Sequence, residues 1–304
     1  MYSFSAFGFA VLERAQVNYG RAKQVQNTLA SSFYCHFVEF VVHPAGPRNG
    51  VGQGQKPILM EPATLSLRHS AKTLWSLYVS KEYNMRFNKA DTALVIIDPQ
   101  NDVLSEKGIS WPLVGASVME NNTVEHLGRL FTAAKAQDYG VFISPHFLYP
   151  HDQGWQFGGM VEKMMLDGNE FYRADPLGRD LIRGDKLTGY GADWLERFKP
   201  FIDDGKTIIA SPHKAWGPQT NDLVFQLRKR RINKIILAGM LANLCVESHL
   251  RELLEEGFEV AVVKDATAAP RHPEIGDGYK AALINYGFLA NAVLTTDDAV
   301  KAIR

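Results

Sequence analysis

Cysteine is scarce in this chain, and the scarcity limits the classes of protein to which it can belong. Only Cys35 and Cys245 occur among 304 residues, so a disulfide framework like that of small secreted domains is not expected. This usage is typical of a reducing compartment, and we expect the cytoplasm. In such a compartment, a single thiol is either a buried core residue or a catalytic group.

The sequence also lacks a long apolar run and an excess of charge. No apolar stretch reaches the roughly 18 residues that a membrane-spanning helix needs, so we expect no membrane association. Lys plus Arg and Asp plus Glu number 33 each, and no basic stripe occurs. Without a positive field, nucleic acid is not an expected partner. A small molecule is the expected partner instead.

The first 60 residues differ in composition from the rest of the chain. They carry five basic and two acidic residues and show no sustained hydrophobic period. They end in a Pro- and Gly-rich run over 43–54, which breaks both helices and strands. We interpret 1–60 as a poorly structured extension or linker and 61–304 as the folded domain. An organelle presequence and a misassigned start, with translation from Met60, are alternatives that the sequence leaves open.

Six short apolar runs predict the strands of a buried sheet. Their apolarity is continuous rather than alternating, which indicates strands covered on both faces, as in a parallel sheet. Amphipathic segments between them supply the covering helices. The sequence therefore predicts a three-layer α/β/α fold with a mostly parallel sheet of about six strands in Rossmann-like topology. The predicted strands are 93–97, 141–143, 207–210, 234–238, 260–263 and 292–295, and the predicted helices 124–137, 221–230, 245–256 and 278–286.

A long segment rich in aromatic residues interrupts this alternation. Residues 147–206 lie between the second and third predicted strands and include Trp155 among eight aromatic side chains that we single out. Insertions of this length usually act as lids or subunit contacts. The same rings are also expected if they pack a small core of their own, and the sequence leaves both interpretations open.

Three chemically active side chains come shortly after predicted strands. They are Asp98, Lys214 and Cys245, and because the carboxyl ends of parallel strands share one edge of a sheet, we expect them to converge there. Cys245 begins a predicted helix, whose first N–H groups favour a thiolate. Each residue alone is explained as a buried thiol, a strand-end cap or a surface charge. Together they predict an activated nucleophile.

The motifs around these residues resemble those of the isochorismatase-like cysteine hydrolases. Residues 98–102, Asp-Pro-Gln-Asn-Asp, resemble the strand end that carries the family's aspartate. Residues 214–228 resemble its lysine block, and residues 239–246 resemble the turn that carries its cysteine. Residues 263–266 resemble the strand that follows. The resemblance covers about residues 92–297 and, with its blocks in the family's order, is specific.

The resemblance implies a catalytic triad of Asp98, Lys214 and Cys245. It also implies an oxyanion hole formed by the N–H groups of Leu241 and Cys245, and a cis peptide bond between Met240 and Leu241. Proteins of such families often associate, so we expect a homo-oligomer. Six further residues are candidates for contact with the substrate. They are Gln100, His146, His151, Trp155, Trp216 and Asn243.

One difference from the family concerns metal binding. The nicotinamidases of this family bind a divalent metal through an aspartate and histidines after the second strand. Here Ser144 has the place of that aspartate, and His146 and His151 follow. Two histidines without a carboxylate make a weak metal site. We therefore expect no metal and no other cofactor, and nicotinamidase activity is disfavoured.

Cys245 decides which of the family's two types of reaction is expected, vinyl ether cleavage or acyl transfer. True isochorismatases cleave a vinyl ether by proton transfer, which needs no sulfur nucleophile, so Cys245 favours acyl transfer. We predict that Asp98 takes the thiol proton, that the thiolate attacks an amide, ureido or carbamoyl carbonyl, and that water hydrolyses the thioester. A vinyl ether hydrolase and a catalytically idle interaction module of the same fold are the alternatives.

Overall fold

A computed structural model of the chain describes residues 85–156, 158–168 and 191–303. The extension predicted over 1–60, its boundary with the folded domain, and Cys35 lie outside the described residues, as does part of the aromatic-rich insertion. Among the helices that the structure describes, none has the length and apolarity needed to cross a membrane.

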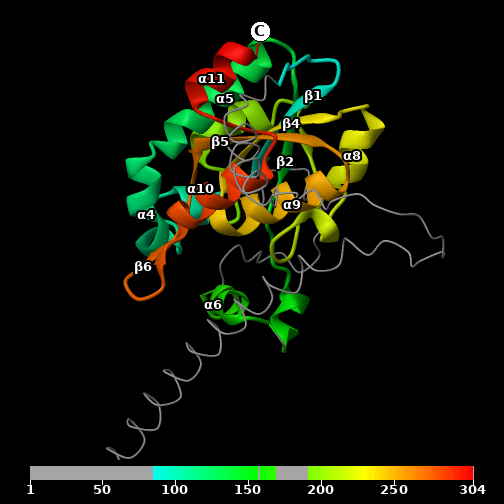
Figure 1. Ribbon diagram of the computed structural model, residues 1–304. Coiled ribbons are helices and arrows are strands. Elements are labelled where there is room, and N and C mark those ends of the chain that lie inside the picture. The colour runs from blue at the N-terminus through cyan, green and yellow to red at the C-terminus, as the bar shows by residue number, and fades with distance from the viewer. Residues whose placement is uncertain (1–84, 157, 169–190, 304) are drawn as a thin grey trace, which may run out of the picture. The chain divides into compact units, whose positions relative to one another are not determined.

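A six-stranded parallel sheet forms the centre of the fold (Figure 1). Every neighbouring pair of strands is parallel, and the strand order is β3-β2-β1-β4-β5-β8. This confirms the predicted three-layer α/β fold. The strands are β1 (Thr92–Ile97), β2 (Gly140–Ser144), β3 (Ile208–Ile209), β4 (Lys234–Met240), β5 (Glu259–Ala268) and β8 (Ala292–Leu294), and a separate hairpin pairs β6 (Arg271–His272) with β7 (Gly276–Asp277).

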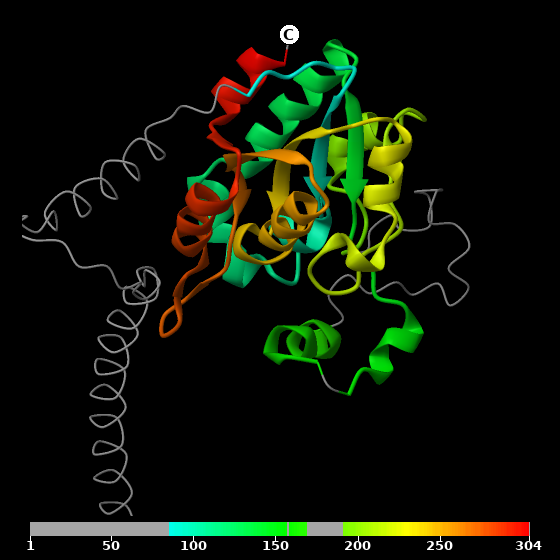
Figure 2. The same cartoon turned by 45° about the vertical axis from the view of Figure 1, so that its right-hand side comes forward.

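Helices cover both faces of the sheet (Figures 1 and 2). Strand β1 is buried along its whole length, and its alternate side chains enter two different apolar clusters, with Leu94 and Ile96 in one and Val95 and Ile97 in the other. Full burial of each such side chain contributes about 1.5–3 kcal/mol. The first cluster is closed by α4 (Trp111–Glu120), α5 (Thr123–Ala136) and α11 (Thr296–Ala302), and the second by α8 (Leu223–Lys229), α9 (Glu247–Glu255) and α10 (Gly278–Leu289).

The remaining described elements are short and lie in the connections. They are α3 (Asn101–Leu104), η1 (Pro150–Gly154), α6 (Met160–Gly168), η3 (Glu196–Phe198), α7 (Lys199–Ile202), η4 (Pro218–Thr220) and η5 (Ala242–Val246). Within the insertion, Phe147 and Trp194 belong to the first apolar cluster, with ring centroids 6.1 Å apart. Trp155 is 40% exposed. At least two of the aromatic side chains therefore pack into the main core of the domain and not into a small core of their own.

The chain reverses its direction across the sheet beside β1. It passes from β1 to β2 on one side, whereas β4 pairs with β1 on the other side. The carboxyl ends of β1 and β4 consequently flank the topological switch point, which is where open α/β sheets bind their ligands. Asp98 follows β1, and the turn that leads to Cys245 follows β4.

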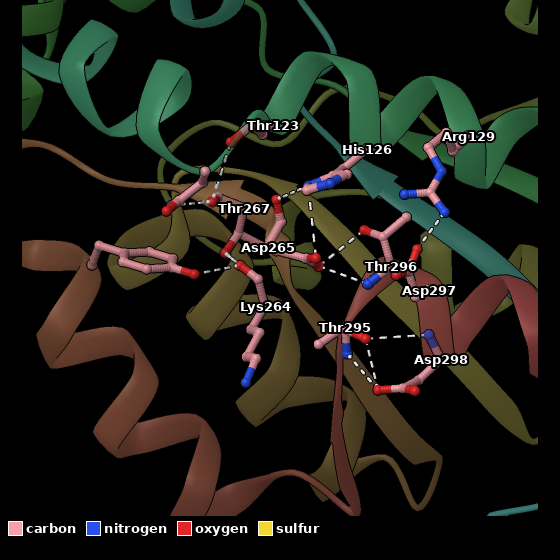
Figure 3. Close-up of polar contacts among 12 residues, drawn as sticks. Thr123, His126, Arg129, Lys264, Asp265, Thr267, Thr295, Thr296, Asp297 and Asp298 are labelled. Carbon is pink, nitrogen blue, oxygen red and sulfur yellow. Dashed lines mark hydrogen bonds and ion pairs between the residues drawn. The ribbon is translucent and has the colours of Figure 1, made fainter.

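A polar network joins the last part of β5 to two helices (Figure 3). The pairing of β4 with β5 shifts register between Leu237 and Gly239, and Asp265 lies in the irregular stretch opposite. The carboxylate of Asp265 accepts hydrogen bonds from the backbone N–H of Thr296 at 2.8 Å and from its hydroxyl at 2.9 Å. The Asp265 carbonyl lies 2.9 Å from Nδ1 of His126 in α5. The network thus fixes the start of α11 to β5 and α5.

Candidate active site

Asp98 is a buried carboxylate at the carboxyl end of the central strand. Its backbone N–H donates to the carbonyl of Ser144 at 3.1 Å, and its φ of 48° lies in the left-handed region where the strand ends. Asp is among the residues that tolerate this conformation best. The residue is 1% exposed. Burial raises the pKa of Asp98 to about 7, although His146, His249 and a hydrogen bond from Cys245 act in the opposite direction.

Cys245 meets this carboxylate from the other side of the switch point. The residue lies in the π-helical turn η5, and α9 begins only at Glu247. The prediction that Cys245 begins the α-helix is therefore wrong, because a π-helical turn precedes α9 and contains Cys245. Such turns are frequent at functional sites. The residue is 7% exposed, its side chain hydrogen-bonds Asp98, and Sγ lies 3.7 Å from the carbonyl oxygen of Ala215. The thiol therefore has a proton acceptor at hand.

The nitrogen that contacts Asp98 belongs to His213. Nε2 of His213 lies 2.9 Å from Oδ1 of Asp98. A carboxylate oxygen of Asp98, a ring nitrogen of His213 and Sγ of Cys245 all lie within 4.8 Å of one another. His213 is fully buried, and burial lowers its pKa to about 3. The imidazole is consequently neutral at pH 7, and it donates its Nε2–H to the Asp98 carboxylate when that carboxylate is ionised.

Lys214, the expected third member of the triad, directs its ammonium group to other partners. Nζ lies 2.6 Å from Oδ2 of Asp152 and 3.1 Å from the carbonyl oxygen of Phe147. It also lies 3.9 Å from the ring centroid of Tyr149. The structure thus brings Asp98 and Cys245 together as expected, whereas the cation of Lys214 is paired with a carboxylate of the aromatic-rich insertion.

His249 is a second buried histidine that sequence reasoning missed. Its Nδ1 lies 2.7 Å from the carbonyl oxygen of Cys245, and its Nε2 lies 2.8 Å from Oγ of Ser144. A carbonyl can only accept, so Nδ1 carries the proton and Nε2 accepts from the Ser144 hydroxyl. Burial lowers the pKa of His249 to about 3, in keeping with a neutral ring. His249 follows Cys245 by four residues, a spacing that places two side chains on the same face of a helix. This spacing is the sequence signal that would have indicated His249.

Gln100 and His146 are bonded to the protein itself. The amide nitrogen of Gln100 donates to the carbonyls of His146 and Ala192, both at 2.8 Å, and its oxygen accepts from the N–H of His146 at 3.0 Å. Nε2 of His146 lies 2.8 Å from the carbonyl oxygen of Lys214, and burial lowers the pKa of His146 to about 4. These contacts favour a structural role for both residues over the expected contact with substrate.

The other four candidates for substrate contact have varied surroundings. The side chain of His151 is 78% exposed, and Trp155 is also exposed. Trp216 is half-buried and packs against both apolar clusters. Asn243 lies beside Gly278, where a Cβ would come within 2.7 Å of its amide nitrogen. Contact with a substrate stays a prediction for these four.

The turn between β4 and Cys245 contains the expected cis peptide bond, Met240–Leu241. Gly239 precedes it with a φ of 118°, and a Cβ there would lie 2.1 Å from the carbonyl oxygen of Ile97. Only glycine fits this close passage of β4 beside β1. The oxyanion hole assigned to the N–H groups of Leu241 and Cys245 stays a prediction.

Comparison with curated proteins relates the chain to hydrolases. It is 26% identical over 233 residues to ureidoacrylate amidohydrolase RutB from Variovorax paradoxus (strain S110), a match that covers 72% of this chain and 83% of that protein. It is also 26% identical over 206 residues to the uncharacterized isochorismatase family protein YecD of Escherichia coli O157:H7, with 61% and 84% covered.

Solved structures share the fold. A cysteine hydrolase from Pseudomonas syringae pv. phaseolicola 1448A superposes with a TM-score of 0.58 at 20% identity, covering 72% of this chain and 95% of that one. An isochorismatase family protein from Desulfovibrio vulgaris subsp. vulgaris str. Hildenborough gives a TM-score of 0.52 at 17% identity, with 69% and 98% covered. The family model of the isochorismatase domain matches residues 92–298. By this match, the chain belongs to the isochorismatase family and is a hydrolase.

Proposed function

We propose that this protein is a cysteine-dependent hydrolase of C–N bonds in small amide, ureido or carbamoyl compounds. The observation that carries the proposal is the hydrogen bond between the Cys245 thiol and the buried carboxylate of Asp98, whose pKa burial raises to about 7. A base near the working pH is suited to taking and returning a proton. The similarity to RutB, an amidohydrolase, supports the type of bond that is cleaved.

The first step is transfer of the thiol proton to Asp98. The S–H bond breaks, the proton moves to the carboxylate, and the thiolate attacks the carbonyl carbon of the substrate. An ordinary thiol has a pKa of about 8.5, so transfer to a carboxylate of pKa about 7 costs about 2 kcal/mol. Transfer to an aspartate at its ordinary pKa of 3.8 costs about 6 kcal/mol. Burial of Asp98 thus makes the nucleophile accessible at neutral pH.

The later steps reuse the Asp98 carboxylate, which first gives up the thiol proton and then carries a proton from water. The N–H groups of Leu241 and Cys245 stabilise the oxyanion of the tetrahedral intermediate. Protonated Asp98 gives its proton to the leaving nitrogen as the C–N bond breaks, and a thioester on Cys245 remains. Water then attacks the thioester, Asp98 accepts the proton of the water, and the thiol takes that proton back when the C–S bond breaks.

The role expected of Lys214 is divided between two neighbouring residues in this proposal. His213 holds the Asp98 carboxylate through a hydrogen bond of 2.9 Å, whereas Lys214 holds the start of the insertion through its 2.6 Å contact with Asp152. His213→Ala is therefore expected to lower kcat more than Lys214→Met does. The reverse order would restore Lys214 to the triad that the family resemblance implies.

The proposed compartment of the enzyme follows from the chemistry of its thiol nucleophile. A catalytic thiol must stay reduced, and we propose the cytoplasm as its compartment. A homo-oligomer is the proposed assembly, on the family resemblance alone.

A substrate panel tests the proposal. Nicotinamide, N-carbamoyl amino acids, ureido acids and isochorismate are incubated with wild-type enzyme and with Cys245→Ala, and released amine or ammonia is measured. We expect turnover of at least one C–N compound and a loss of about 10³-fold or more in Cys245→Ala. Mass spectrometry should detect a thioester on Cys245.

The alternatives give different outcomes in the same panel. Turnover of isochorismate that survives in Cys245→Ala would favour a vinyl ether hydrolase. No turnover of any compound would favour the idle interaction module. His272→Gln, in the exposed β6–β7 hairpin, is the matched control and should behave as wild type.

A further inference from the structure

The side chains of Asp98, His213 and Cys245 bring three different metal-binding atoms together. One carboxylate oxygen, one imidazole nitrogen and the thiol sulfur all lie within 4.8 Å of one another, and all three residues are buried. A tetrahedral zinc ion binds oxygen and nitrogen at about 2.0–2.2 Å and sulfur at about 2.3 Å, which places its ligands roughly 3.3–3.8 Å apart. The observed separations lie close enough for small rotations of the side chains to close the site.

The imidazole of His213 makes this cluster different from one built with an amine. A lysine in contact with Asp98 would carry a positive charge at pH 7 and would repel a cation. His213 is neutral there, because burial lowers its pKa to about 3, and a neutral imidazole is a common zinc ligand. In the metal-free enzyme, Nε2 of His213 donates to Asp98. Zinc binding through Nε2 therefore requires the ring proton to move to Nδ1, and the imidazole keeps its one proton.

The charges around the cluster also suit a divalent cation. A thiolate and a carboxylate together neutralise the two charges of Zn²⁺, and binding displaces the thiol proton into solvent. The ammonium of Lys214 is close in sequence, but Asp152 lies 2.6 Å from it and offsets its charge. Three protein ligands leave the fourth position of a tetrahedral ion open to water.

We propose that Asp98, His213 and Cys245 form a zinc-binding site that inhibits the hydrolase by occupying its nucleophile. The site differs from the metal site of nicotinamidases, whose aspartate position is Ser144 here. Binding itself follows from the three donors, and only the inhibition rests on the proposed function. Zinc and the substrate compete for the same sulfur, so inhibition should be reversed by a chelator.

Cobalt substitution tests binding without any need for activity. Co²⁺ alone is added to the full chain, and the near-ultraviolet band from thiolate to Co²⁺ charge transfer is recorded together with the visible bands of four-coordinate cobalt. Zn²⁺ affinity is then measured by competition, and proton release is followed in weak buffer. At pH 8, where a carboxylate of pKa about 7 is mostly ionised, we expect one equivalent of metal, a thiolate band and release of about one proton per ion.

Two variants and a control distinguish this site from binding elsewhere. Cys245→Ser should abolish the charge-transfer band. His213→Lys should lower zinc affinity by more than about 100-fold, beyond the roughly 10–100-fold effect of outer-shell changes, and should leave the thiol in place. His272→Gln removes an exposed histidine and should change neither the band nor the affinity. Circular dichroism of each variant checks that it is folded.

The outcomes separate this inference from the proposed function. Absence of a thiolate band, or unchanged affinity in folded His213→Lys, would overturn the zinc site even if amide hydrolysis is intact. Activation by Zn²⁺, rather than inhibition, would also overturn it. A thiolate band in an enzyme that cleaves no C–N compound would support the site and contradict the proposed function.

Discussion

Asp98 lies directly after strand β1 and Asp265 lies in the last part of strand β5, yet their hydrogen-bond partners give the two aspartates different chemistry. The carboxylate of Asp265 accepts two hydrogen bonds from Thr296, one of them from the backbone N–H at the start of α11. Its side chain is 26% exposed. Asp98 is 1% exposed, and its partners are the imidazole of His213 and the thiol of Cys245.

The difference shows how the same residue type becomes structural in one place and reactive in another. Backbone N–H groups and hydroxyls near a helix start stabilise an ionised carboxylate and cannot readily give up their protons. A thiol can give up its proton, and burial raises the pKa of Asp98 to about 7, which favours acceptance of that proton. The identity of the donor and the degree of burial therefore decide the role of each aspartate.

The largest expected effect comes from removing the charge of Asp98. Asp98→Asn keeps the shape of the side chain but cannot accept the thiol proton, so kcat on a C–N substrate should fall by about 10²–10⁴-fold. Asp265→Asn makes the same chemical change in the other network (Figure 3) and should leave kcat within about twofold of wild type, because Asp265 touches no reacting group. Steady-state kinetics of both variants measures the contrast. Equal losses in the two would contradict the assignment of Asp98 as the base.

A second effect concerns how folding stability changes with pH. Burial lowers the pKa of His146 to about 4 and of His213 and His249 to about 3, from 6.5. The unfolded chain binds these three protons below pH 6.5 and the folded chain does not, so stability is lost as pH falls. Asp98 acts oppositely between 3.8 and about 7, because its raised pKa keeps a proton on the folded form. Near pH 5, unfolding should therefore take up about two protons at these groups.

Urea unfolding at a series of pH values measures this effect. Uptake of two protons corresponds to a loss of about 3 kcal/mol per pH unit as an upper limit. His249→Gln should reduce the slope by about one proton, whereas His272→Gln should not change it. Stability that is flat between pH 6.5 and 5 would show that the histidines are not held neutral in the folded protein.

The strands could be predicted from the sequence because their signal is local. Continuous apolar runs gave all six strands of the sheet, and only Ile208–Ile209 of the run 207–210 pair with β2. The shift in register beside Asp265 could not be predicted in this way, since it depends on how β5 meets β4. The described structure does not reach residues 1–60, so their interpretation stays a prediction.

The site was predictable where it depends on strand ends, and not where it depends on side-chain direction. Asp98 and Cys245 follow neighbouring strands, so their meeting follows from topology. His213 and Lys214 are adjacent where an isolated bridge ends and a bend begins, and their side chains reach different partners. A bridge between His146 and His213 fixes which of the two faces Asp98. That bridge is a contact between distant segments, which sequence alone does not show.

The smallest effect completes the comparison at Asp265. Asp265→Ala removes both hydrogen bonds that Thr296 donates, so the N–H of Thr296 loses its acceptor, although the Thr295 cap of α11 remains. The free energy of unfolding should fall by about 1–2 kcal/mol, as for other lost helix caps. Because α11 packs in the apolar cluster across the sheet from α8, α9 and α10, kcat should stay near the wild-type value. Thermal unfolding and kinetics measured on one preparation test both statements, and a large loss of kcat in a fully folded Asp265→Ala would mean that the two aspartates are coupled.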